Sequence, residues 1–412
     1  MRLKISPNFL LVVLGNVLRL GAGMVVFVVL ARCLGPSDFG SFAFWLAIAT
    51  LAVIPVNFGF TTATLRAFGV DPERKQAQMA AVLTAKLLLA GGVLAIAAVI
   101  GGLTLDTSAA LILMPLLLAQ IAESVSELYG LGFRAASNFA AEARTASVVS
   151  LVHIVIMLTT PWLFDSVQAV AAAFLLSRVL GLLITRAQSH AAFDHIGLAP
   201  LKDALAFSRS AFAYAVELAL STAYTQLDTL VINAALGLRA VGLYQAGMKL
   251  VQGFSRLAPI LALYILPRLA GDMKNGSRST KQAASTLLLF GGVGLLSGGC
   301  LAVFAEPITL LLFGAEFTEL AQLLPLFGCL LALRFLETGC GLVLVAAGLQ
   351  SKKVWLVAGQ LTLMLAIGWL AIHKGGMQAW LLTTLACTLL LLLMYLLLWV
   401  RTRTAAEEPV QP

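Results

Sequence analysis

The sequence predicts an all-α membrane protein of about twelve transmembrane helices, and both its composition and its apolar runs indicate this class. Of the 412 residues, 60% are apolar and 11% are charged, against roughly 45–50% and about 25% in soluble domains. Apolar stretches of about 20 residues, long enough to cross a bilayer, recur from Phe9 to Val400. So few charges could not cover a soluble fold of this length, which excludes a globular cytosolic enzyme.

The expected spans form two sets of six, joined by a polar segment. The first set begins near Asn8, Asp38, Met79, Ala109, Ala146 and Val167. The second set begins near Ser210, Ala240, Ala283, Leu320, Val354 and Gln378. We therefore expect a six-helix lobe at 1–190, a cytoplasmic linker at 191–209, a second six-helix lobe at 210–401 and a disordered tail at 402–412.

The distribution of lysine and arginine predicts the orientation. With the amino terminus inside, the cytoplasmic loops hold 18 of these cations, and the opposite loops hold three, Arg32, Arg239 and Lys374. Cytoplasmic loops of membrane proteins carry an excess of positive residues, so we expect both termini in the cytoplasm. The net charge of +8 is then a result of this bias and does not indicate a nucleic-acid partner.

The two halves share a weak internal repeat. Leu34-Gly35 recurs as Leu236-Gly237 at an offset of 202, and Gly91-Gly92-Val93 recurs as Gly291-Gly292-Val293 at an offset of 200. Because each half has an even number of spans, both would have the same orientation in the membrane. Parallel repeats of this kind occur in transporters that bind substrate between the repeats and alternate access by rocking.

Eleven ionisable residues lie inside the expected spans, where a charge near the bilayer centre costs about 2.5–3.5 kcal/mol. We expect them to face one another or a water-filled lumen. The cations are Arg19, Lys86, Arg178, Lys249, Arg256 and Arg334, and the acids are Glu123, Glu127, Glu217, Asp228 and Glu337. In the seventh span, helical spacing places Tyr214, Glu217, Ser221, Tyr224 and Asp228 on one polar stripe.

Several of these charges allow two interpretations. Arg334 and Glu337, three residues apart, form either a structural ion pair or part of the lumen. Glu123 and Glu127 either pair with a cation on another span or handle protons. Lys86 lies near the cytoplasmic end of its span, so its side chain is expected to reach the membrane surface. The mid-span cations are interpreted as a lumen that attracts an anion.

The cysteines and histidines predict neither a metal site nor catalysis. The five cysteines form no CxxC pair, and the four histidines have no HExxH spacing. Neither a nucleophile–base pair nor a glycine loop for phosphate accompanies the polar stripes. The sequence therefore predicts no cofactor, no metal and no enzymatic activity.

Three segments resemble known signatures. Residues 29–44, Val-Leu-Ala-Arg-Cys-Leu-Gly-Pro-Ser-Asp-Phe-Gly-Ser-Phe-Ala-Phe, resemble the opening signature of Wzx-type polysaccharide flippases, in the polysaccharide-biosynthesis branch of the MATE-like superfamily. Residues 226–232 together with 241–251 are similar to that family's mid-chain signature, and 312–317 resemble a third, looser one. The resemblance covers nearly the whole chain.

The resemblance implies a two-lobed bundle in the bacterial inner membrane. Such a protein would flip an undecaprenyl-pyrophosphate-linked oligosaccharide to the outer leaflet, with transport coupled to an ion gradient. Its expected partners are membrane lipids, glycosyltransferases and a polysaccharide polymerase. Arg19, Arg178, Lys249, Arg256 and Arg334 are then the candidate contacts for the pyrophosphate, which suits arginine's planar fork. The candidates for ion coupling or charge balance are Glu217, Asp228, Glu123, Glu127 and Glu337.

Two other functions remain open from the sequence. A cation-coupled multidrug exporter of the same superfamily would favour an acidic, aromatic-lined cavity. A membrane enzyme of polysaccharide assembly would need catalytic residues near a membrane surface, often on a long external loop, and every expected external loop is short.

Overall fold

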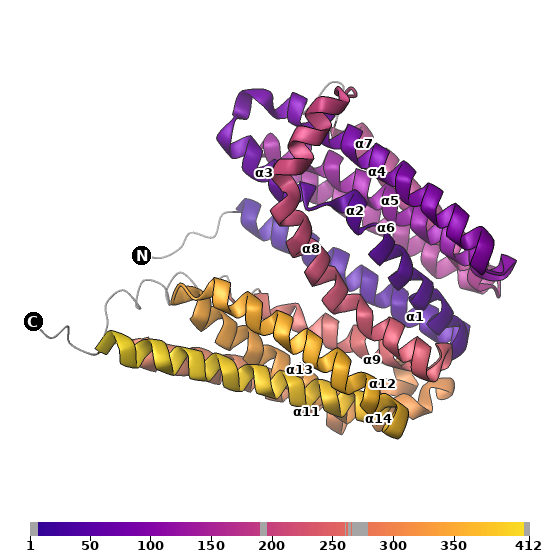
Figure 1. The fold of residues 1–412 in the computed structure, drawn as a ribbon. Helices are drawn as coiled ribbons and strands as arrows, with labels where there is room; N and C mark the ends of the chain where they lie inside the picture. Colours follow the sequence, from indigo (N-terminus) through magenta and orange to yellow (C-terminus); the bar gives the residue numbers. More distant parts are fainter. Residues whose placement is uncertain (1–6, 190–195, 260, 263–264, 266–278, 408–412) are drawn as a thin grey trace, which may run out of the picture. The chain divides into compact units, whose positions relative to one another are not determined.

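The computed structural model describes residues 7–189, 196–259, 261–262, 265 and 279–407. The side chains of 7–22, 279–281, 351 and 402–407 lie outside the described part. The described chain is almost entirely helical (Figure 1), which confirms the all-α prediction. By its internal packing the chain divides into two units, Met1–Leu230 and Val231–Pro412.

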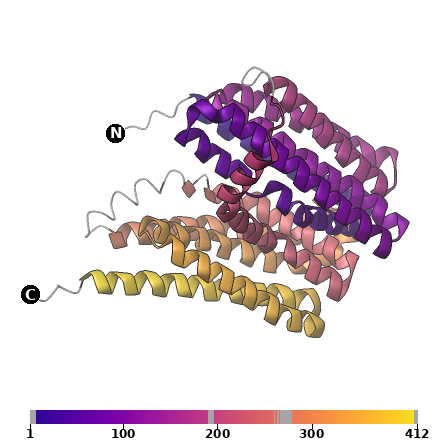
Figure 2. The ribbon, with the colours of Figure 1, turned by 45° about the horizontal axis from the view of Figure 1, so that its top comes forward.

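The first unit contains the elements up to most of α8. Their bounds are α1 (Pro7–Ala52), α2 (Ile54–Asn57), α3 (Phe60–Val70), the 3-10 turn η1 (Pro72–Arg74), α4 (Lys75–Thr104), α5 (Thr107–Ala135), α6 (Phe139–Leu163), α7 (Val167–Ser189) and α8 (Leu201–Leu236). Helices α4 to α7 run side by side, as the labels in Figure 1 and the purple helices in Figure 2 show. α1 packs against α6, α5 and α7.

Glycines with positive φ end or break the long helices of the first unit. Gly35 has φ 71° inside α1 and is followed by Pro36, so the expected start of a second span near Asp38 coincides with a real break. Gly59, with φ 65°, separates α2 from α3. A Cβ atom at Gly59 would lie 2.5 Å from the backbone carbon of Tyr214, so glycine is what allows α8 to pack against this turn.

The second unit contains the end of α8 and six further elements with described bounds. These are α9 (Leu238–Ser255), α11 (Ser279–Val303), α12 (Ala305–Leu312), the 3-10 turn η2 (Ala315–Phe317), α13 (Thr318–Ala346) and α14 (Gln350–Glu407). α13 packs against three helices of this unit, α11, α9 and α14 (salmon to yellow in Figure 1). α14 is broken at Gly375 and Gly376, next to the expected span start at Gln378.

Within the described residues, eight helices are long and apolar enough to cross a membrane. Two of them, in α1 and α14, contain or adjoin the breaks just described. Outward-facing apolar side chains on α4, among them Leu88, Ile96 and Val99, are exposed in the folded chain, as expected for a surface in contact with lipid. The protein is a multi-pass membrane protein, whereas the count of twelve and the cytoplasmic termini stay predictions.

The expected linker, lobe boundary and tail differ from the structure. Residues 201–209 of the expected linker form the first turns of α8, and 190–195 lie outside the described residues. The boundary between the two packing units follows Leu230, near the end of α8, whereas the expected boundary at 209–210 lies near the start of the same helix. Of the expected tail, 402–407 continue α14 and 408–412 lie outside the described residues.

Candidate functional site

A polar cavity of about 730 Å³ lies inside the first unit. It is lined by residues of α1, the α2–α3 turn, α5, α6, α7 and α8. Its ionisable side chains include four carboxylates and two guanidinium groups, which are Glu123, Glu127, Glu142, Glu217, Arg134 and Arg178. The cavity is therefore richer in acids than in arginines.

Helical spacing directs the lining residues of α5 and α7 to one side. On α5, Glu123, Glu127, Gly130 and Arg134 are separated by three or four residues and line the cavity together. On α7 the same spacing aligns Arg178 with Gly181 and Thr185.

The α8 stripe predicted from the sequence is also present in part. Tyr214, Glu217 and Ser221 all line the cavity. The Tyr214 hydroxyl accepts a hydrogen bond from Nη1 of Arg66 at 3.1 Å, and this bond connects α8 to α3. Asp228, further along the stripe, is buried and is not among the residues that line this cavity.

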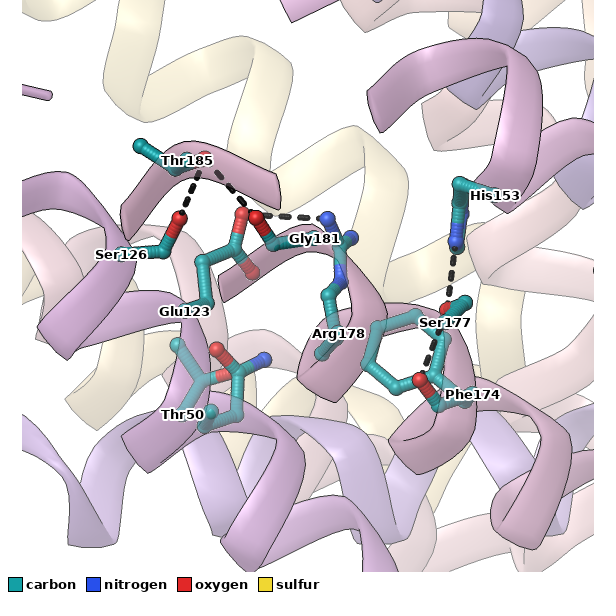
Figure 3. A network of polar contacts seen from close by, with 10 residues as sticks. Thr50, Glu123, Ser126, His153, Phe174, Ser177, Arg178, Gly181 and Thr185 are labelled. Atoms are coloured by element: carbon teal, nitrogen blue, oxygen red, sulfur yellow. Dashed lines mark hydrogen bonds and ion pairs between the residues drawn. The ribbon is translucent and has the colours of Figure 1, made fainter. Parts of the chain in front are cut away.

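The central contact of the cavity is an ion pair between α5 and α7. Nη1 of Arg178 lies 3.2 Å from Oε1 of Glu123, and Figure 3 shows the two side chains pointing toward one another. The guanidinium also lies over the ring of Phe174, 4.7 Å from its centroid. Of the two interpretations for Glu123, pairing with a cation on another span is the one that the geometry shows.

A second polar contact joins α6 to α7. Nδ1 of His153 lies 2.9 Å from the Ser177 hydroxyl oxygen, and this hydroxyl donates to the Phe174 carbonyl at 2.7 Å (Figure 3). A carbonyl oxygen can only accept, so the single Ser177 proton is used there. When Ser177 donates to this carbonyl, its oxygen accepts from His153, and the His153 tautomer that fits this arrangement carries its proton on Nδ1.

Three further contacts fix the walls of the cavity. Ser126 on α5 donates to the Thr185 hydroxyl at 3.1 Å, and Thr185 donates to the Gly181 carbonyl at 2.8 Å. Nε of Arg134 lies 2.9 Å from Oε1 of Glu142, which ties α5 to α6. Each of the two arginines in the cavity is thus paired with a carboxylate.

The prediction that Lys86 reaches the membrane surface is wrong. Its side chain is 1% exposed, and its ammonium donates to the Ser124 hydroxyl at 2.6 Å. It also lies 5.9 Å from the centroid of the Phe60 ring. α4 packs against α2, α3 and α5, so these elements cover Lys86 and its ammonium finds its acceptor on α5.

The cavity unites some of the predicted site residues and not others. It gathers Arg178, Glu123, Glu127 and Glu217. Lys249, half-buried on α9, and Arg256, exposed at the end of α9, belong to the second unit. The Arg19 side chain lies outside the described side chains, although its backbone is part of α1.

The second unit contains a separate group of charges around Glu337. Two cations interact electrostatically with this carboxyl, and they are Arg334, on the same helix, and Lys353, on α14. The ammonium of Lys353 packs over Gly341, where a Cβ atom would lie only 2.7 Å from it. The sequence left Arg334 and Glu337 as either an ion pair or part of the lumen, and it counted Lys353 among the cations of the cytoplasmic loops. Gly341, four residues after Glu337, is the signal that marks room for another side chain.

Sequence reasoning also missed His153, Arg134 and Glu142 as cavity residues. His153 has no motif spacing, and its partner is on another helix, so only the fold brings the two together. Arg134 was counted among the cations of the cytoplasmic loops, and Glu142 was not assigned, because they lie at the ends of α5 and α6.

Comparison with known proteins agrees with the fold. The lipid II flippase MurJ in an inward closed conformation has a TM-score of 0.78 at 14% identity, covering 95% of this chain and 87% of that one. An inward-facing multidrug resistance MATE family transporter of the MOP superfamily has a TM-score of 0.72 at 14% identity, covering 95% and 96%. The eukaryotic MATE transporter AtDTX14 has a TM-score of 0.59 at 14% identity, covering 98% and 100%. These likenesses show the fold.

The sequence comparison is more specific. No curated protein matches the chain by sequence. The profile of a family described as polysaccharide biosynthesis protein matches residues 5–271, a range that contains nearly all of the first unit and both of the more specific signature segments. The protein has the fold of MOP-superfamily transporters and belongs to the polysaccharide biosynthesis protein family.

Proposed function

We propose that the protein is a flippase that moves an undecaprenyl-pyrophosphate-linked oligosaccharide from the cytoplasmic to the outer leaflet of the bacterial inner membrane. The observation that carries this proposal is the family match over residues 5–271. The likeness to the fold of a lipid II flippase, which handles a lipid-linked substrate, supports it.

The intramembrane charges suit such a substrate. Its pyrophosphate is anionic, and arginine and lysine bind phosphate oxygens through charge-assisted hydrogen bonds. Lys249, Arg256 and Arg334 are the candidate contacts in the second unit, with Arg19 in the first, whereas the sequence candidate Arg178 is already paired with Glu123. Ionisable groups inside membrane spans are rare, and they typically line the pathway of a substrate or an ion.

We further propose that transport is coupled to an ion and proceeds by alternating access. A carboxyl on α8 could take up a proton or sodium ion, and Glu217 and Asp228 are the candidates. Glycosyltransferases that build the oligosaccharide and a polymerase that consumes it are the expected partners in the pathway.

The experiment is complementation of a strain from which the gene has been deleted. The deletion is expected to abolish surface polysaccharide and to accumulate the lipid-linked oligosaccharide, and the intact gene is expected to restore the polymer. Arg256→Ala should express normally and restore little polymer, whereas Arg74→Ala, in an exposed loop, should restore it fully. A deletion strain with normal surface polymer would overturn the function, and full polymer from both Arg19→Ala and Arg256→Ala would overturn the role of the cations.

One observation favours a second candidate, a cation-coupled multidrug exporter. The cavity of the first unit has four carboxylates against two arginines, and acidic cavities suit cationic drugs. An exporter should change the tolerance of cells to cationic dyes when it is overproduced or deleted. The flippase proposal expects unchanged dye tolerance together with loss of surface polymer.

The contact between His153 and Ser177 does not support the alternative of a membrane enzyme. Ser177 is 1% exposed, and its hydroxyl proton is directed to the Phe174 carbonyl. A serine nucleophile would instead have to donate to the histidine and be accessible to substrate.

A further inference from the structure

We propose that the cavity of the first unit binds the sugar part of the lipid-linked oligosaccharide, and that His153 recognises a sugar hydroxyl there. This inference rests on the proposed flippase function and names the part of the substrate that this unit contacts. It is carried by the charge balance of the cavity, by the fixed hydrogen-bonding state of His153 and by the size and lining of the cavity.

The charge balance disfavours a pyrophosphate in this cavity. Arg178 is paired with Glu123 at 3.2 Å and Arg134 with Glu142 at 2.9 Å, so both arginines are already opposed by carboxylates. Glu127 and Glu217 also line the cavity, which leaves its arginines outnumbered. An anionic group would meet like charges here, whereas sugar hydroxyls would meet hydrogen-bond acceptors.

His153 offers an acceptor of defined geometry. The side chain lines the cavity and is 8% exposed. Its Nδ1 donates to Ser177, because the Ser177 proton goes to the Phe174 carbonyl. In the neutral ring, Nε2 then carries a lone pair and no proton. A nitrogen locked in this state complements an O–H donor and does not suit a second acceptor such as a phosphate oxygen.

The size and lining of the cavity fit a carbohydrate. Its volume of about 730 Å³ lies within the range of about 300–1,000 Å³ that small-molecule sites occupy. Besides the carboxylates, side chains with hydroxyl or amide groups line it, among them Asn57, Thr61, Thr62, Ser150 and Ser221. Sugars need many donors and acceptors placed around one volume, and this cavity supplies them from several different helices.

The test measures binding of two probes to the purified full-length protein in detergent. One probe is undecaprenyl pyrophosphate, and the other is the undecaprenyl-pyrophosphate-linked oligosaccharide that accumulates in cells lacking the gene. The intact protein should bind the glycosylated probe more tightly. His153→Phe should weaken this binding by about tenfold, as expected for loss of one net hydrogen bond, and leave undecaprenyl pyrophosphate binding unchanged.

Matched variants separate recognition from folding. His373 is an exposed histidine that is hydrogen-bonded to the Trp369 carbonyl. The variant His373→Phe should therefore bind both probes like the intact protein. His153→Gln, which keeps an acceptor near the position of Nε2, should retain most of the preference for the glycosylated probe. Ser177→Ala keeps the ring but releases its tautomer, so an intermediate loss is expected.

The outcomes distinguish this inference from the function beneath it. If no lipid-linked oligosaccharide accumulates, or if the intact protein binds neither probe, the flippase function fails. If the protein binds both probes equally, or if folded His153→Phe and His153→Gln weaken both probes alike, the flippase function survives and the sugar site is wrong. Tetraphenylphosphonium as a third probe tests the exporter, because His153-dependent binding of this cation without a preference for the glycosylated probe would also overturn the sugar site.

Discussion

Helices α4 and α11 carry the same Gly-Gly-Val triplet, 200 residues apart, yet they pack in different ways. Around Gly91 and Gly92 of α4 an added Cβ would meet nothing within 4 Å. On α11, Gly292 of the triplet is equally open, and a Cβ atom at Gly291 would lie 3.0 Å from Cδ2 of Leu336. The closest approach follows the triplet, where a Cβ atom at Gly298 would lie 2.3 Å from the Gly328 carbonyl oxygen on α13. α11 is therefore held by a backbone-to-backbone crossing.

α4 is joined to α5 by a buried polar contact in addition to apolar packing. Its Lys86 ammonium donates to Ser124 on α5, while much of the helix surface is apolar and exposed. A repeat that survives in the sequence has thus diverged in what fixes the helix. The two units also differ in their charges. The first unit encloses an acid-rich cavity, whereas in the second unit Arg334 and Lys353 interact electrostatically with Glu337.

The largest expected effect comes from closing the glycine contact. Gly298→Ala should reduce the free energy of unfolding by about 3 kcal/mol, because overpacking a close helix crossing forces the backbones apart. Gly92→Ala, in open space on α4, should be neutral or stabilising by about 0.5–1 kcal/mol. Thermal unfolding of the purified variants in detergent measures both, and equal effects of the two substitutions would contradict the comparison.

The polar anchor of α4 should come next in size. Ser124→Ala removes the acceptor of the buried Lys86 ammonium, which is 1% exposed, and is expected to cost about 2 kcal/mol. Ser126→Ala serves as the control, because its hydroxyl bonds to Thr185 and not to a charge. If Ser124→Ala unfolds at the same temperature as Ser126→Ala, Lys86 does not anchor α4 through this bond.

The sequence could predict features that depend on the local chain, but not the contacts between helices that distinguish α4 from α11. Long apolar runs predicted the helices and placed span starts near Asp38 and Gln378, next to the breaks at Gly35 and Gly376, because these features depend on local backbone and bilayer physics. The burial of Lys86 and the His153–Ser177 contact depend on which faces meet across helices. Residues far apart in the chain decide those contacts, so helical spacing alone could place Glu123 and Arg178 on inward faces but could not pair them.

The ion pair between Glu123 and Arg178 gives the third prediction. Its side chains are 37% and 24% exposed, so removing Arg178 should cost less than for a fully buried pair, about 1–2 kcal/mol. The double variant Glu123→Leu with Arg178→Leu should recover most of the stability, because no charge is then left without its partner.

An exposed pair in the second unit is the matched control. Arg239 and Glu319 lie 2.9 Å apart, with side chains 51% and 60% exposed, so Arg239→Leu should change unfolding by less than about 1 kcal/mol. Equal losses from Arg178→Leu and Arg239→Leu would mean that partial burial adds nothing to the first pair.

The smallest effect is expected at the exposed connection between α4 and α5. The Ser108 hydroxyl, which donates to the Asp106 carboxylate, holds the pKa of Asp106 below its ordinary value, and nearby backbone amides act in the same direction. A carboxyl whose pKa is lower in the folded state stabilises the protein above about pH 4, the ordinary value, and loses this contribution as pH falls through the lowered pKa. Ser108→Ala should therefore raise this pKa and move the acid loss of stability to higher pH, while Asp106→Asn should abolish it. Unfolding temperatures measured between pH 3 and pH 7 test this, and identical profiles for intact protein and Asp106→Asn would show that the first unit gains nothing from this contact.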